Sequence, residues 1–100
     1  MKEIKTEDEL SRFIDENEKC LVKFSAVWCG PCRQLLPILE DLEIQEVIKI
    51  SEVNIDEAGD LAMKYNIRSV PSTLIFENKE IKNMFVGVKS AQEILDLYNA

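Results

Sequence analysis

FSAVWCGPC, at residues 24–32, is the stretch that decides how this chain folds. It ends a compact, largely apolar run at residues 20–25 and leads into apolar side chains at three- and four-residue spacing as far as Leu42. The first pattern is typical of a strand and the second of a helix. A run rich in β-branched residues follows at residues 47–54. The sequence therefore predicts a strand, a helix and a second strand, with the two strands parallel.

The flanking segments complete one domain around this unit. Before the unit they predict a short strand at residues 2–4 and a helix at residues 7–17. After it they predict a short helix at residues 61–65, two strands at residues 73–76 and 81–86 joined by a turn, and a last helix from residue 90 onward. Thr6 with Glu9, and Ser90 with Glu93, have the spacing of capping boxes. Parallel strands need cover on both faces. We therefore expect an α/β domain over residues 1–100, with a central mixed sheet of five, or four, strands and helices on both faces.

The turn between the last two predicted strands has an unusual sequence. Asn78 is followed by Lys79, at a place where a type I′ hairpin turn usually has Asn-Gly. We therefore expect this turn not to be type I′.

Composition excludes several classes of protein. The chain is 46% hydrophobic and 31% charged, as in ordinary globular proteins, and its net charge is -7. The basic side chains form no stripe that could follow phosphates, so nucleic acid and anionic membranes are poor partners. No apolar run approaches the roughly 18 residues of a membrane span, and residues 1–13 lack the apolar core of a signal peptide. We expect a cytoplasmic monomer.

Three cysteines and no histidine limit the possible chemistry. An odd number of cysteines argues against a structural disulfide framework and favours a reactive pair or a metal site. A structural zinc site needs four ligands, mainly Cys and His, and this chain offers three sulfurs at most. We therefore expect no metal. Cys20 begins an apolar strand, so we interpret it as an inert buried thiol.

Cys29 and Cys32 form the candidate redox pair, because positions i and i+3 of a helix share a face. Only a thiolate attacks a disulfide, and a free cysteine, with a pKa of about 8.5, is mostly protonated at neutral pH. Lowering the pKa of Cys29 by about 1.5 units takes about 2 kcal/mol. A helix N-terminus contributes about 0.3–2 kcal/mol, so the dipole and one or two hydrogen bonds suffice. We assign Cys29, open to solvent, as the nucleophile and Cys32 as the resolving thiol.

The residues around the pair support this assignment over a chance pair of core cysteines. Gly30 has no side chain to obstruct a partner, and Pro31 suits the first turn of a helix because it lacks an N–H. A CxxC motif alone is weak, but a strand before it and a helix after it are the context that a redox motif requires.

At this point the chain resembles the thioredoxin family. The likeness runs from about Leu21 to Tyr98, and its motifs are specific in combination. They are Trp28 to Cys32, Pro37 to Leu39, V-N-I-D at residues 53–56, Y-N-I-R-S-V-P at residues 65–71, and Gly87. The resemblance implies the thioredoxin fold and a disulfide reductase with no cofactor other than the redox-active Cys29–Cys32 disulfide.

The resemblance also implies a substrate-binding surface. In the family the proline that matches Pro71 is cis and leaves the backbone of the preceding residue, here Val70, free to pair with an extended substrate. The implied apolar contact patch comprises Trp28, Gly30, Pro31, Val70, Pro71, Val86 and Gly87. Asp56 would help to hold the Trp28 ring, and Pro37 would kink the second helix. By composition alone, Pro71 is an ordinary strand-edge proline, Trp28 fits the core equally well and Gly87 simply ends a strand.

Two positions depart from the family pattern. Lys23 stands where thioredoxins usually have a buried Asp below the resolving cysteine, and Glu52 stands where they usually have a Lys on the neighbouring strand. A buried Lys is tolerable only when it is paired or neutral, so we expect Glu52 to face it. One hypothesis is that Glu52, or the pair together, takes over the proton-accepting role that the family's Asp plays for the resolving thiol. The alternative is an exchanged ion pair that only preserves packing.

The resulting functional hypothesis is a general protein-disulfide reductase. Its partners would be disulfide-containing target proteins and a thioredoxin reductase or an equivalent enzyme that recycles it. Two alternatives are a glutathione-linked, glutaredoxin-like reductase and a redox-inert binding module with the same fold. Both cysteines of the pair are intact, which argues against the binding module.

Overall fold

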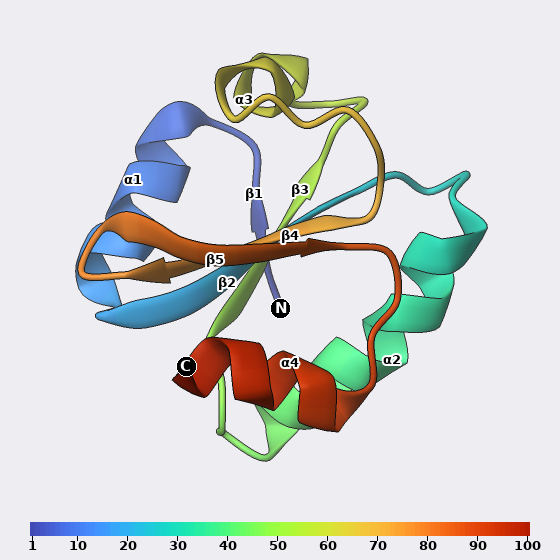
Figure 1. The fold of residues 1–100 in the computed structure, drawn as a ribbon. Helices are drawn as coiled ribbons and strands as arrows, with labels where there is room; N and C mark the ends of the chain where they lie inside the picture. The colour runs from blue at the N-terminus through green and yellow to red at the C-terminus, as the bar shows by residue number, and fades with distance from the viewer.

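The computed structural model describes residues 1–100 and contains nine elements of regular structure (Figure 1). In chain order they are β1 (Lys2–Ile4), α1 (Glu7–Glu16), β2 (Lys19–Ser25), α2 (Gly30–Ile44), β3 (Ile50–Asn54), α3 (Gly59–Lys64), β4 (Ser72–Glu77), β5 (Glu80–Val86) and α4 (Ala91–Asn99). The predicted order of strands and helices is confirmed. No helix combines the length and apolar character needed to cross a bilayer.

The strands form one mixed sheet in the order β1-β3-β2-β4-β5. β1 and β2 both run parallel to β3, whereas β4 is antiparallel to β2 and β5 is antiparallel to β4. The parallel pairing of the two strands that flank α2 and the five-stranded mixed sheet are therefore confirmed. β2 lies at the centre, and every residue of it after Lys19 is buried.

Helices cover both faces of the sheet. Figure 1 shows α1 and α3 on one side and α2 and α4 on the other. Alternate residues of β2 point to opposite faces, as the period of a strand requires. Val22 and Phe24 join the apolar core under α1 and α3, while Leu21 joins the core under α2 and α4. Lys23 follows the period of Leu21, which directs its side chain toward α2.

The end of α2 explains one wrong boundary. We expected the second long strand to begin at Val47, but β3 begins at Ile50. Glu46 has a φ of 59°, and the N–H groups of Glu46 and Val47 donate to the carbonyls of Glu43 and Leu42. These two bonds form a Schellman motif, which satisfies the last carbonyls of the helix. Val47 is therefore part of the helix end and cannot pair in the sheet.

The expectation for the hairpin turn is wrong. Asn78 and Lys79 have φ values of 53° and 71°. Positive φ at both central residues is the pattern of a type I′ turn, whose twist matches that of the strands it joins. The Asn78 N–H also donates to the Glu18 carbonyl at 2.7 Å. This contact with the α1–β2 connection, together with the hairpin twist, holds Lys79 in a conformation that its own side chain disfavours.

The N-terminus of α4 allows a direct test of local stability. Ser90 Oγ accepts from the Glu93 N–H at 3.2 Å, and Glu93 Oε1 accepts from the Ser90 N–H at 3.1 Å. Ser90→Ala removes the first of these bonds, so we expect the free energy of unfolding to fall by about 1 kcal/mol. Urea unfolding measures the change, with Ser90→Thr as the capping-competent control. Equal midpoints for wild type and Ser90→Ala would show that the cap does not stabilise the protein.

Candidate active site

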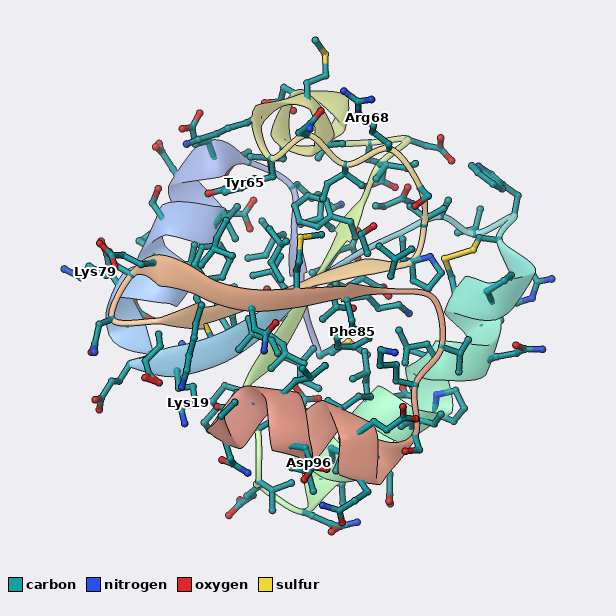
Figure 2. All side chains as sticks on the ribbon, in the orientation of Figure 1. Lys19, Tyr65, Arg68, Lys79, Phe85 and Asp96 are labelled. Atoms are coloured by element: carbon teal, nitrogen blue, oxygen red, sulfur yellow. A yellow bond between two sulfur atoms is a disulfide. The ribbon has the colours of Figure 1, made fainter.

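Cys29 and Cys32 form a disulfide at the N-terminus of α2, just after the end of β2. The two Cα atoms are 5.3 Å apart. Figure 2 shows the yellow sulfur–sulfur bond at the first turn of α2. Cys29 is the N-cap residue of α2, and Pro31 occupies the first turn, where a missing N–H costs nothing. The exposed loop after β2 thus brings the two predicted redox residues together at one end of the helix.

The N-cap position determines the electrostatics of Cys29. Its Sγ accepts from the Cys32 N–H at 3.2 Å. A backbone N–H aimed at the sulfur and the positive end of the helix dipole both favour negative charge there. Cys29 Sγ also lies 3.6 Å from the Val70 carbonyl oxygen. The Cys32 N–H and the helix dipole, and not this carbonyl, are therefore the groups that stabilise a Cys29 thiolate without a histidine.

Burial of the pair differs from our expectation. Cys29 is 4% exposed and Cys32 is 2% exposed, and Ile55 and Val70 pack against them. Cys29 is the more accessible of the two by a small margin, but the expectation that it is open to solvent is wrong for the disulfide form. A partner must therefore pack closely against the neighbouring surface before its sulfur can reach Cys29.

That neighbouring surface comes from three parts of the chain. Trp28 is 64% exposed and Val86 is 52% exposed. The Val70–Pro71 peptide bond is cis, and the Gly87 N–H donates to the Pro71 carbonyl at 2.9 Å, next to the register pair of Val86 with Ser72. Val86 and Gly87 thus lie next to the Val70–Pro71 segment that contacts Cys29, but Pro71 itself is buried, which differs from the implied contact patch.

Sequence reasoning missed part of the site. A hollow of about 240 Å³ is lined by Trp28, Val70 and four residues to which we assigned no role, namely Ile55, Ile67, Arg68 and Ser69. These four lie within the two stretches quoted for the resemblance. Only the folded chain shows that these two segments line the same hollow.

Asp56 contacts Trp28 as the resemblance implies. The indole Nε1–H donates to Asp56 Oδ2 at 2.9 Å, and both residues are exposed. An exposed Trp side chain otherwise has several rotamers open to it, so this bond orients the ring beside Cys29.

The expected ion pair between Lys23 and Glu52 is present. The two residues are register partners on β2 and β3, and Lys23 Nζ lies 3.1 Å from Glu52 Oε2. The Lys23 side chain is 1% exposed and that of Glu52 is 31% exposed. Lys23 Nζ also donates to the Cys32 carbonyl at 3.1 Å. A buried cation is thus fixed directly beneath the resolving cysteine.

Cys20 is isolated from this site. It is 0% exposed on β2, and burial raises its pKa to about 12. At pH 8 the thiolate is therefore a negligible fraction, and we expect an alkylating agent to leave Cys20 unmodified in the native, reduced protein. Peptide mass mapping with and without denaturant measures this. Rapid native labelling of Cys20 would show that the strand opens.

The described chain places no group of three or more His, Cys, Asp or Glu side chains where they could bind a metal ion.

Comparisons with known proteins agree with the geometry. A family model described as Thioredoxin matches residues 2–100. A thioredoxin of Buchnera aphidicola subsp. Baizongia pistaciae is 38% identical over 97 residues, which cover 94% of this chain and 89% of that protein. A thioredoxin of Rickettsia conorii is 40% identical over 81 residues, with 79% and 77% covered. The solved structure of a mutant thioredoxin from Halobacterium salinarum NRC-1 has a TM-score of 0.92 at 31% identity, with 98% of this chain and 87% of that chain covered.

Proposed function

The chain belongs to the thioredoxin family of disulfide reductases, and from that premise we propose that it reduces disulfides in a range of target proteins and is recycled by a separate reductase. The observation that carries the proposal is the position of Cys29. Its sulfur caps α2, is bonded to Cys32 and lies beside an exposed apolar surface. A protein partner can dock on such a surface more readily than a small thiol can.

The reaction consists of two exchanges. First, the Cys29 thiolate attacks one sulfur of the target disulfide; a Cys29–target bond forms, the target bond breaks, and the departing sulfur takes up a proton. Next, Cys32 loses its proton and attacks Cys29 Sγ. The Cys29–Cys32 bond forms, and the second target sulfur leaves and is protonated. The target gains two electrons and two protons; Cys32 supplies one of the protons and solvent the other, and the reductase later returns two electrons to the pair.

The contact patch supports the choice of protein targets. The Val70 carbonyl lies next to Cys29 Sγ, so an extended target segment that bonds to the backbone there would bring its own cysteine to the sulfur. Trp28 and Val86 would cover the flanks of that segment. Because Cys29 is 4% exposed, docking beside it would favour a protein target over a thiol that does not dock.

Insulin reduction with three electron donors tests the proposal. We expect activity with dithiothreitol and with a thioredoxin reductase, and little with glutathione. Activity with glutathione alone would favour a glutaredoxin-like reductase. No activity with any donor would favour a redox-inert binding module.

We also propose that the protein works in the cytoplasm as a monomeric electron carrier in redox homeostasis. The support is its cysteine usage, because Cys20 remains a free thiol and the redox pair forms the one disulfide. Acid trapping and alkylation of cells would report the redox state of the pair in each compartment. Recovery of the protein mainly outside the cytoplasmic fraction would contradict the location.

A further inference from the structure

A second hollow lies next to Cys32. It measures about 270 Å³ and shares no lining residue with the hollow beside Trp28. Its walls combine the ion pair and the resolving cysteine with six other residues, and the full set is Lys23, Ser25, Ala26, Val27, Cys32, Arg33, Leu36, Glu52 and Asn54. Water can therefore reach the neighbourhood of Cys32 by a route separate from the surface on which a target docks.

The second exchange needs a proton acceptor at this place. Cys32 must lose its proton before it attacks Cys29, and the chain contains no histidine to take that proton. Of the charged groups that line the hollow, Lys23 and Arg33 are cations without an acceptor site. Glu52 is the one carboxylate among them. It is 31% exposed, so a proton it receives can pass on to solvent.

The surroundings hold the Glu52 carboxylate in a defined position. Oε2 receives bonds from Lys23 Nζ at 3.1 Å and from Ser25 Oγ at 3.3 Å. Arg33 of α2 lines the same hollow, and Glu3 of β1 is the register partner of Glu52 on its other side. Lys23 also binds the Cys32 carbonyl, so one ammonium group ties the carboxylate to the segment that carries the thiol.

We propose that Glu52, held in place by Lys23, accepts the proton of the Cys32 thiol through water in this hollow during release of the reduced target. The inference rests on the proposed function and adds to it the residue that makes Cys32 a competent nucleophile. The proton leaves Cys32 Sγ, Glu52 becomes neutral, the Cys32–Cys29 bond forms, and Glu52 returns the proton to solvent as the target thiolate takes one up. The competing explanation is an ion pair that only stabilises the fold.

A two-phase exchange experiment separates these explanations. The reduced protein is mixed with an equimolar aromatic disulfide that releases one coloured thiolate at each exchange. The fast phase reports attack by Cys29 and the slow phase reports attack by Cys32. For Glu52→Gln we expect the fast phase to be unchanged and the slow phase to be at least about tenfold slower at neutral pH, with its pH profile displaced to higher pH. Glu52→Asp should restore part of the rate.

Glu77→Gln is the matched control. Glu77 also pairs with lysines, Lys82 at 2.7 Å and Lys19 at 3.8 Å, and its side chain is 27% exposed. Lys19 lies far from the disulfide (Figure 2). If Glu52 only stabilises the fold, Glu52→Gln and Glu77→Gln should both be less stable than the wild type. In both variants the slow phase and its pH profile should then be unchanged.

Each outcome decides a specific point. A slow phase in Glu52→Gln with the wild-type rate and pH profile overturns the role of Glu52, while an intact fast phase keeps the proposed function. Absence of both phases in the wild type overturns the proposed function itself. If Glu52→Gln does not fold, the variant that combines it with Lys23→Met removes both charges, and the same slow second phase is expected of it.

Discussion

Cys29→Ser is expected to lower the rate of insulin reduction by about 10³-fold or more. A serine hydroxyl stays protonated near neutral pH and cannot form the mixed disulfide. The other two thiols cannot substitute, because Cys32 lacks the N-cap position of Cys29 and Cys20 is 0% exposed on β2. The measurement is the rate of insulin precipitation with dithiothreitol, after subtraction of the uncatalysed rate.

Two further cysteine variants control this experiment. Cys20→Ala keeps a small apolar side chain in the core and should retain the wild-type rate. Cys32→Ser should stop turnover after the first exchange and accumulate a mixed disulfide on Cys29, which mass spectrometry of the intact protein detects. Accumulation of the adduct on Cys32 in the Cys29→Ser variant would instead reverse the two assigned roles.

The second large effect concerns stability. Glu52→Leu leaves the buried Lys23 ammonium with the Cys32 carbonyl as its remaining partner. We expect the free energy of unfolding of the oxidised protein to fall by about 3 kcal/mol, as is typical when one member of a buried pair is removed. Lys23→Met should lower the free energy of unfolding by less, about 1 kcal/mol, because the Glu52 side chain is 31% exposed and water can solvate its charge.

The double variant isolates the pairing energy. Lys23→Met combined with Glu52→Leu leaves neither charge behind, so it should be more stable than Glu52→Leu alone. Urea unfolding of the four proteins closes the cycle. If the two single losses simply add in the double variant, the ion pair contributes nothing to stability and Lys23 is neutralised in another way.

Local signals in the sequence were sufficient to predict most of the helices and strands. Thr6 and Ser90 do accept from the N–H groups of Glu9 and Glu93, since a cap is formed by residues three positions apart. The predictions for the start of β3 and for the type of the hairpin turn were wrong. The first depends on how α2 ends, and the second on the Asn78–Glu18 contact between different elements.

Some residues of the candidate site could be identified from local sequence, and others could not. The CxxC spacing, read with the strand before it and the helix after it, was enough to identify Cys29 and Cys32. The roles of Trp28, Asp56, Val70 and Pro71 followed only from the resemblance, because their side-chain patterns are equally consistent with an ordinary core or strand end. Burial of Cys29 in the disulfide form was not foreseen, since exposure depends on the packing of Ile55 and Val70 from other segments.

The sequence by itself determined the redox chemistry and the α/β order of this protein, because both depend on residues close together in the chain. The resemblance placed Val70 and Lys23 near the redox pair, but the tertiary structure alone decided the atoms in contact: the Val70 carbonyl with Cys29 Sγ, the Lys23 ammonium with the Cys32 carbonyl, and the hollow beside Cys32. These contacts join segments 9 to 41 residues apart. Whether such segments meet depends on the sheet order and register, which arise from packing of the whole chain.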